Sequence, residues 1–307
     1  MDIVFPSIFV VIVTHNSLSW YDRCLSSLRA SEVPLHVVII DNGSTDNTVE
    51  YITRDYPEVT LLPLGKNIGF GQGNNKGIQY ALSKGADYLF LLNQDAWIEP
   101  DTIQQLITIH KSHPEYGVLS PMHLNVEKNS IELLLLERID DYKITDPELV
   151  NDLYFNRLKE VYNTRYVNAA AWLLPRKTIE TVGGFDPLFF HYGEDDNYLH
   201  RIFYHGFKAG ICPRTHIVHD CKTKREIYDD HESDILMMIH YSDVNQDYAF
   251  NREMLRNFRI AVTSFLRRRK KRVHSSWRTY QFLKQHKKSL KISVETNRTM
   301  GLHWLRQ

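Results

Sequence analysis

The strongest constraint on the fold is a regular alternation of short apolar runs and stretches of helical length in the first 120 residues. The apolar runs are rich in β-branched or aromatic residues, and each ends in polar or turn-forming residues: Ile8–Val13, Val37–Ile40, Val59–Leu64 and Tyr88–Leu92. The stretches of helical length between them are Leu18–Ala30, Thr48–Asp55 and Asn74–Ser83. Because such alternation forms a mainly parallel sheet with helices on both faces, we predict an α/β, Rossmann-like domain.

Polar clusters follow three of these predicted strands at the point where each ends. They are Thr14-His15-Asn16, Asp41-Asn42-Gly43-Ser44 and Asn93-Gln94-Asp95. In open α/β sheets, ligands bind outside the carboxyl ends of the strands. The coincidence therefore predicts a binding site at this edge of the sheet.

The cluster Asn93-Gln94-Asp95 has the chemistry of a metal site. A carboxylate at a strand end, with a second oxygen ligand two residues earlier, can hold Mg²⁺ or Mn²⁺ against a diphosphate. Asn and Asp also favour turns and helix N-caps, so the cluster by itself leaves a purely structural role open.

Two other segments suit a nucleotide. Asp41 could accept hydrogen bonds from a base, and Gly43 allows close backbone approach, whereas Asp46 is expected to cap the next helix. The glycine-rich stretch Asn67–Asn75 precedes a predicted helix, which suits phosphate or ribose contacts. Its Gly-x-Gly-x-Gly spacing differs from the dinucleotide fingerprint, so this signal is weak on its own.

Three acids in succession, Glu194-Asp195-Asp196, follow the aromatic run Phe189–Tyr192. Neighbouring carboxylates raise one another's proton affinity, which suits a general base. A solvated acidic loop is the alternative, although the apolar lead-in argues against full solvation. His216 and His219 lie nearby in the sequence, and single histidines are more often surface residues than ligands.

The C-terminal part of the chain has a different character. The whole chain has no net charge, but from Met254 onward it holds fifteen Lys and Arg against one acid, Glu295, a local balance of +14. The preceding part is correspondingly acidic. We expect a domain over residues 1–253 and a basic helical extension over 254–307, whose apolar positions Leu255, Phe258, Val262, Phe265 and Leu266 lie near one helix face. The extension could contact an anionic membrane surface or pack on the acidic domain.

Composition and the N-terminus favour a cytoplasmic protein. The three cysteines have neither disulfide nor metal-ligand spacing. The apolar run Ile8–Val13 lacks the basic start and cleavage site of a signal peptide and is too short to span a bilayer. No nucleic-acid-reading module is recognised, so nucleic acid is not an expected partner.

Taken together, the motifs resemble glycosyltransferase family 2, the inverting enzymes of the GT-A fold, and most closely its rhamnosyltransferase-like branch. They occur in family order from about residue 8 to residue 221. The matching segments are the first strand (Val10–Asn16), a VIDNGSTD-like segment (Val38–Asn47), an N-x-G-x-x-x-G-x-N-x-G loop (Asn67–Gly77), an LLNxD form of the DxD metal motif (Leu91–Asp95) and a VGGFDxxFFxYxEDxDxxxR-like block (Val182–Arg201).

The resemblance implies a role for each matching position. Asp95 and the late histidine His219 would bind Mg²⁺ or Mn²⁺, with His216 as an alternative alignment. Asp195 would be the catalytic base, with Asp196 the alternative and Glu194 beside it. The nucleotide-sugar donor would be held by Thr14, Asn16, Asp41, Gly43, Asn67, Gly69, Asn75, Asn93 and Gln94.

The chain departs from the family pattern at two positions. Asn93 replaces the first aspartate of DxD, which leaves the metal one charged ligand fewer, and Asn197 replaces the last acid of EDxD. The resemblance implies transfer of a hexose, with rhamnose a candidate, from a dTDP- or UDP-linked donor to a glycan or lipid-linked hydroxyl in bacterial surface polysaccharide synthesis. The enzyme would be cytoplasmic or peripheral at the inner face of the membrane. A nucleotidyltransferase and a non-catalytic sugar-nucleotide-binding protein are the alternatives.

Overall fold

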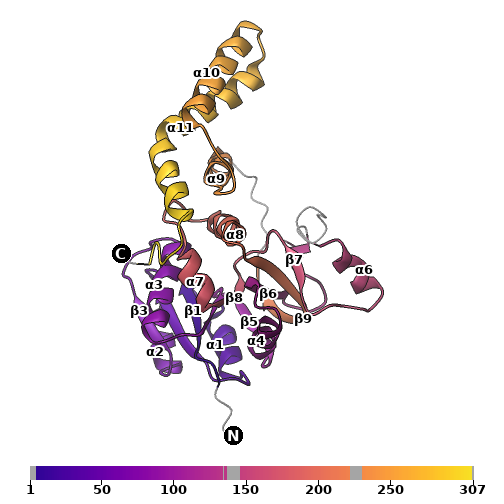
Figure 1. Ribbon diagram of the computed structural model, residues 1–307. Coiled ribbons are helices and arrows are strands. Elements are labelled where there is room, and N and C mark those ends of the chain that lie inside the picture. Colours follow the sequence, from indigo (N-terminus) through magenta and orange to yellow (C-terminus); the bar gives the residue numbers. More distant parts are fainter. Residues whose placement is uncertain (1–4, 134, 137–145, 222–229, 306–307) are drawn as a thin grey trace. The chain divides into compact units, whose positions relative to one another are not determined.

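The computed structural model describes residues 5–133, 135–136, 146–221 and 230–305 (Figure 1). The chain divides into two compact units. The first comprises Met1–Lys224 together with Met300–Gln307, and the second is Arg225–Thr299. The boundary expected at residues 253 and 254 therefore falls inside the second unit.

A single mixed sheet organises the first unit. Its strand order is β3-β2-β1-β4-β8-β6-β9-β5, and β7 also pairs with β9. The strands are β1 (Ile8–Thr14), β2 (His36–Asp41), β3 (Thr60–Pro63), β4 (Tyr88–Leu92), β5 (Ala96–Ile98), β6 (Tyr116–Leu124), β7 (Tyr162–Thr164), β8 (Ala171–Pro175) and β9 (Lys208–His219).

The predicted parallel arrangement is confirmed for the strands of the first half of the sheet, where β3, β2, β1 and β4 are parallel neighbours. The second half is mixed. Strand β8 runs antiparallel to both β4 and β6, whereas β9 runs parallel to β6 and antiparallel to β5. The carboxyl ends of β1, β2 and β4 consequently lie together at one edge, as the site prediction requires.

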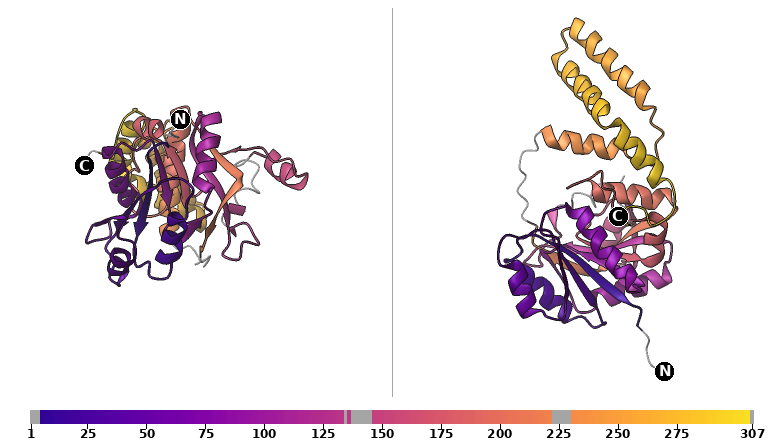
Figure 2. Two further views of the ribbon diagram at one scale, coloured as in Figure 1. Left: turned by 90° about the horizontal axis from the view of Figure 1, so that it is seen from below. Right: turned by 90° about the vertical axis from the view of Figure 1, so that its left-hand side faces the viewer.

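Helices cover both faces of this sheet (Figures 1 and 2). Alternate residues of β1 face opposite cores: Phe9 and Val11 pack with one, whereas Ile8, Val10 and Ile12 pack with the other. The first core includes side chains of α3 (Phe70–Ser83), α7 (Arg176–Val182) and α8 (Glu194–Tyr204). The second includes side chains of α1 (Tyr21–Arg29), α2 (Thr48–Asp55) and α4 (Thr102–Ser112). Burial on both faces explains the nearly continuous apolar strands.

Several element boundaries differ from the sequence predictions. Helix α3 begins at Phe70 rather than Asn74, so part of the expected glycine-rich loop is helical. Helix α1 begins at Tyr21 rather than Leu18, and strand β3 is shorter than the predicted run Val59–Leu64. Between β6 and β7 the described chain also holds the short helix α6 (Glu148–Tyr154).

The chain returns to the first unit at its C-terminal end. The Gly301 amide donates to the Thr181 carbonyl at 2.9 Å, and the Gly184 amide donates to the His303 carbonyl at 2.9 Å. Leu305 is buried in the core that α3 shares with the sheet. These last residues are therefore part of the sheet-containing unit and do not belong to the basic helices that precede them.

The second unit is helical and consists of α9 (Asp230–Tyr241), α10 (Phe250–Leu266) and α11 (Lys270–Asn297). Helices α10 and α11 lie side by side as a hairpin (Figure 2). The turn between them places Arg268 at φ 55°, with the Arg269 amide bonded to the Ser264 carbonyl and the Arg268 amide to the Phe265 carbonyl. This is a Schellman ending with arginine where glycine is usual. Among the described residues, no helix has the length and apolar character needed to cross a bilayer.

Candidate active site

A pocket of about 340 Å³ opens at the carboxyl ends of β1, β2 and β4. Its lining includes the predicted residues Thr14, Asn67, Gly69, Asn93, Gln94 and Asp95. It also includes His15 and Asn42 of the predicted polar clusters, together with Val13, Phe70, Phe190 and His191. The expected position at the strand ends is therefore occupied by a pocket of the size typical for small-molecule ligands.

Gln94 joins the ends of β1 and β4. Its side-chain oxygen accepts hydrogen bonds from the Thr14 hydroxyl at 2.9 Å and from the His15 amide at 2.8 Å. Gln94 therefore fixes one wall of the pocket as well as lining it.

Asn16 and Asp41 hold the turn after β2 and do not line the pocket. The Asn16 side-chain oxygen accepts a hydrogen bond from the Thr45 amide at 2.8 Å, and the Asp41 carboxylate accepts one from the Ser44 amide at 3.2 Å. Gly43 lies in the same turn, where a Cβ atom would come within 2.8 Å of the Lys66 backbone. The turn and the segment leading to Asn67 are therefore packed directly against each other.

Asn42 lines the pocket and belongs to one of the predicted polar clusters, although no separate role was predicted for it. Its amide nitrogen donates to the Asn67 side-chain oxygen at 2.9 Å, and its own oxygen accepts a hydrogen bond from the Ile68 amide at 2.9 Å. The Asn67 oxygen also accepts a hydrogen bond from the Gly69 amide at 2.8 Å. These bonds fix the chain just before α3 against the end of β2.

Gly69 and Asn75 connect this region to the segment before α8. Gly69 has φ +89°, and a Cβ atom there would lie 2.2 Å from the Phe190 carbonyl oxygen, so only glycine fits. Asn75 is buried and bonds both the amide and the carbonyl of Phe185, at 2.7 and 2.8 Å. Asn75 does not line the pocket, and its contacts are those of a structural bridge.

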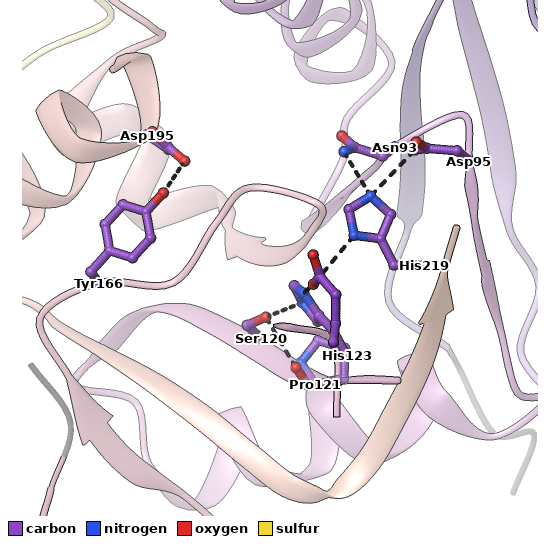
Figure 3. Close-up of polar contacts among 9 residues, drawn as sticks. Asn93, Asp95, Ser120, Pro121, His123, Tyr166, Asp195 and His219 are labelled. Atoms are coloured by element: carbon purple, nitrogen blue, oxygen red, sulfur yellow. Dashed lines mark hydrogen bonds and ion pairs between the residues drawn. The ribbon is translucent and has the colours of Figure 1, made fainter. Parts of the chain in front are cut away.

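Asp95 and His219 are brought together by strand pairing. Ala96 of β5 pairs with His219 of β9, and the Asp220 amide donates to the Asp95 carbonyl at 2.9 Å. One Asp95 carboxylate oxygen lies 3.4 Å from His219 Nε2, and the Asn93 amide nitrogen lies 3.5 Å from the same atom (Figure 3). His216, in contrast, faces Glu99 at 3.6 Å.

The donor set at this position fits a divalent cation. A carboxylate, an imidazole and an amide converge there, and the buried Asn93 side-chain oxygen has no hydrogen-bond partner among the described residues. Carboxylate and carbonyl oxygens suit Mg²⁺ and Mn²⁺, whereas imidazole is a ligand for transition-metal ions. Burial disfavours the charged form of His219, but hydrogen bonds to Asp95 and Glu132 outweigh this effect and raise its pKa to about 9.

His123 and Glu132 extend this cluster and were missed by the sequence analysis. A Glu132 carboxylate oxygen lies 3.4 Å from His219 Nδ1 and 3.3 Å from His123 Nδ1. All three side chains are buried. No spacing signal could have found them, because β6 and β9 bring the residues together from distant parts of the chain.

The three acids begin α8, after Gly193. Asp195 accepts a hydrogen bond from the Tyr166 hydroxyl at 2.9 Å and from the Asp196 amide at 2.9 Å (Figure 3). Burial raises the pKa of Asp195, against the opposing effect of the Tyr166 hydrogen bond. Burial and the neighbouring Asp195 charge raise the pKa of Glu194 to about 8. None of the three acids lines the pocket.

The family model for glycosyl transferase family 2 matches residues 9–167, just over half of the chain. The chain belongs to this family.

Curated relatives of this transferase act on sugars. It is 28% identical over 229 residues to an N-acetylglucosaminyl-diphospho-decaprenol L-rhamnosyltransferase of Mycobacterium tuberculosis, covering 68% of this chain and 75% of the relative. It is 24% identical to the dTDP-rhamnosyl transferase RfbF of Shigella flexneri, covering 69% of each. These similarities support the rhamnosyltransferase-like branch.

Solved structures share the fold of this family 2 transferase. S. aureus TarS 1-349 in complex with UDP-GlcNAc superposes with a TM-score of 0.55 at 17% identity, covering 79% of this chain and 68% of that one. The mannosyltransferase PcManGT of Pyrobaculum calidifontis, in complex with GDP-Man and Mn²⁺, gives a TM-score of 0.54 at 17% identity, covering 78% and 62%. At this identity the likeness establishes the GT-A fold alone.

Proposed function

We propose that this transferase moves a sugar, with rhamnose the leading candidate, from a dTDP- or UDP-linked donor to an acceptor hydroxyl with inversion. The acceptor would be a glycan or lipid-linked saccharide of bacterial surface polysaccharide synthesis. The observation that carries the proposal is the pairing of Asp95 with His219 at a pocket outside the strand ends. The names of the curated rhamnosyltransferase relatives support the choice of sugar.

The pocket would hold the nucleoside diphosphate part of the donor. Thr14, Asn42 and Asn67 line it from the ends of β1 and β2 and from the chain before α3. Asp41 lies next to Asn42 but does not line the pocket, and its carboxylate accepts a hydrogen bond from the Ser44 amide. We therefore assign base recognition to the Asn42 and Asn67 amides, with Asp41 holding the turn beside them.

Asp95 and His219 would hold the cation, Mn²⁺ or Mg²⁺, with Asn93 beside them. A bound divalent cation supplies Lewis-acid stabilisation of the negative charge that develops on the departing diphosphate.

Asp195 would be the catalytic base. It takes the proton of the acceptor hydroxyl while that oxygen attacks the anomeric carbon, and the carbon–oxygen bond to the diphosphate breaks with its electron pair leaving on the nucleoside diphosphate. The raised pKa of Asp195 increases its proton affinity, which suits this task. The Tyr166 hydroxyl holds one carboxylate oxygen and thereby orients the group.

The basic helices favour a lipid-linked acceptor at an anionic membrane surface. On α10 the residues packed inward are Asn257, Ala261 and Ser264, whereas the apolar stripe predicted from the sequence is exposed. The stripe ends in Phe265 and Leu266, which are 72% and 74% exposed and precede six consecutive basic residues, Arg267–Arg272. Outward apolar side chains beside clustered cations are the pattern of an interfacial helix.

A donor panel tests the proposal. UDP-, dTDP- and GDP-sugars are compared by thermal shift with Mn²⁺, since a ligand that binds only the folded protein raises its apparent stability. The stabilising donor is then incubated with acceptor extract, and release of nucleoside diphosphate that depends on acceptor and is abolished by EDTA is the expected result.

Other products would identify the alternatives. Pyrophosphate release would indicate a nucleotidyltransferase, and donor binding without turnover would indicate a sugar-nucleotide-binding protein. Full activity in EDTA would remove Asp95 and His219 from the mechanism.

A further inference from the structure

Behind the Asp95–His219 pair lies a buried row of polar side chains, His219, Glu132, His123 and Ser120. Figure 3 labels three of them, His219, His123 and Ser120. Glu132 is 4% exposed and His123 is fully buried. The row continues with His123 Nε2, which lies 3.1 Å from the Ser120 hydroxyl. Burying these polar side chains away from water costs free energy. We therefore expect them to have a function at the neighbouring proposed metal site.

Glu132 faces both histidines with one oxygen. A carboxylate oxygen can accept the ring N–H of each. Each histidine turns its Nδ1 atom toward the same Glu132 oxygen, at 3.3 and 3.4 Å.

A metal ligand needs a free lone pair on Nε2 of His219, the nitrogen that lies 3.4 Å from Asp95, so metal binding displaces the Nε2 proton. The proton that stays on the ring is then carried by Nδ1, which faces Glu132 at 3.4 Å. His219 Nδ1 has no hydrogen-bond partner among the described residues, so the contact with Glu132 is one of ion-pair distance.

Glu132 is itself fixed by the strand that carries His123. The Glu132 amide donates to the His123 carbonyl of β6 at 2.9 Å, whereas His219 ends β9. The carboxylate thus ties the position of the imidazole ring to a neighbouring strand of the sheet.

We propose that Glu132 is a positioning residue for metal binding: it fixes the tautomer and orientation of His219 from behind, and His123 holds Glu132 in place. This inference rests on the proposed metal site at Asp95 and His219. Carboxylates that accept the second ring proton of a metal-binding histidine raise its basicity and orient it, and their loss weakens metal affinity by about 10- to 100-fold.

The test measures Mn²⁺ binding directly, by the electron paramagnetic resonance signal of free Mn²⁺ in the presence of UDP. Glu132→Gln keeps the shape but removes the charge, so we expect a 10- to 100-fold weaker dissociation constant. The KM for Mn²⁺ should rise by a similar factor, while kcat at saturating Mn²⁺ stays within a few-fold of the wild-type value. His123→Asn, which leaves Glu132 in place, should have a smaller effect of the same kind.

Two reference variants distinguish a wrong role for Glu132 from a wrongly placed metal site. Asp152→Asn removes another buried carboxylate, one that accepts a hydrogen bond from the Tyr162 hydroxyl at 2.8 Å, and should leave Mn²⁺ affinity unchanged. Asp95→Asn should weaken Mn²⁺ binding strongly. If Asp95→Asn binds Mn²⁺ like the wild type, the metal site itself is wrongly placed.

The inference on Glu132 is overturned if Asp95→Asn loses affinity while Glu132→Gln and His123→Asn keep it. It is also overturned if the wild type binds a second ion that His123→Asn abolishes, because the three buried side chains would then be ligands themselves. Should Glu132→Gln not fold, the His123→Asn result decides between these outcomes.

Discussion

Asp195 and Glu194 are neighbours in the first turn of α8, yet their surroundings differ. Asp195 is half-buried and bonded to the Tyr166 hydroxyl, whereas one oxygen of the buried Glu194 has no hydrogen-bond partner among the described residues. Where protein surroundings move the pKa values of two carboxyl groups apart, separate functions are expected. The proposed base is accordingly Asp195, and for Glu194 we expect a neutral, structural role.

Asp195→Asn should retain donor binding and lose transfer by 100-fold or more, because general base catalysis typically contributes about 10²- to 10⁴-fold. Donor binding is measured by thermal shift and transfer by nucleoside diphosphate release. Asp196→Asn is the matched control and should stay within a few-fold of wild type. The reverse result would move the base to Asp196, and normal turnover in both variants would remove the acids from the chemistry.

Glu194→Gln should change how stability depends on pH. The folded-state pKa of Glu194, about 8, exceeds its ordinary value of 4.5, so its neutral form favours folding at low pH. This stabilisation is lost as the pH rises from about 4.5 to 8. In that range the unfolded state releases the Glu194 proton, whereas the folded state must either keep the proton or bury a charge. Between pH 5.5 and 8.5 the free energy of unfolding of Glu194→Gln should fall by less than that of the wild type. The two decreases should differ by roughly 1 kcal/mol or more. Urea unfolding at both pH values measures this, and parallel pH profiles would contradict it.

At the scale of residues, the sequence pattern located pocket-lining positions where they follow one another in one segment, as Asn93, Gln94 and Asp95 do. Asp95 follows its strand directly, and the sequence pattern alone marked it as a metal ligand candidate. His219 came only from the family resemblance. Glu132 was missed, and no separate role was predicted for Asn42, because their partners, His219 and Asn67, lie far away in sequence. These residues meet only through strand pairing and packing.

Helix α3 approaches β1 unusually closely, and its glycines are the reason. A Cβ atom on Gly77 would lie 2.2 Å from the nearer Val11 methyl carbon, and one on Gly73 would lie 2.8 Å from a Val13 methyl carbon. The sequence analysis took the glycine-rich segment as a candidate phosphate loop. Its later glycines instead allow close packing, whereas Gly69 remains at the pocket.

Gly77→Ala should therefore destabilise the protein by roughly 1–3 kcal/mol through overpacking. Val11→Ala removes the opposing methyl groups, so the double variant should lose less stability than the sum of the two single variants. A coupling of about 0.5–3 kcal/mol is typical for residues in contact. Chemical denaturation of the four proteins measures it, and strict additivity would show that the two positions do not clash.

Local pattern predicted β1 to β4 well because each is a short buried run with clear ends. It predicted the second half of the sheet poorly, for a physical reason. Strand β9 contains Pro213, Arg214 and His216, and its pairing with β6 shifts register between Pro121 and Met122. An irregular strand of this kind has neither continuous apolar character nor regular alternation.

Across the whole molecule, charge is segregated along the chain. The basic segment from Met254 onward opposes an acidic remainder, and its most exposed apolar residues lie beside its densest cations. Arg268 occupies the left-handed position of the hairpin turn, where a residue other than glycine strains the backbone. Its presence is consistent with selection for a positive charge there.

Full-length protein should sediment with phosphatidylglycerol-containing vesicles and not with neutral phosphatidylcholine vesicles. Phe265→Ser with Leu266→Ser should reduce binding by about 10-fold or more, because buried apolar area and basic residues both contribute to interfacial affinity. Phe155→Ser, at another exposed aromatic residue, is the matched control. Raised salt should weaken binding. Equal binding to both vesicle types, or a concentration-dependent dimer lost in the double variant, would contradict the membrane assignment.

Residues 300–305 return to the sheet-containing unit, so the helical unit is inserted in the chain between two segments of that unit. Shortening the chain after residue 253 would remove Leu305 from the core and the His303 carbonyl from Gly184, just before the segment that leads to α8. Loss of activity in such a protein would not distinguish loss of membrane binding from disruption of the segment that leads to α8. A single proteolytic cut between residues 224 and 225 would likewise leave the helices covalently joined to a peptide that is still packed in the first unit.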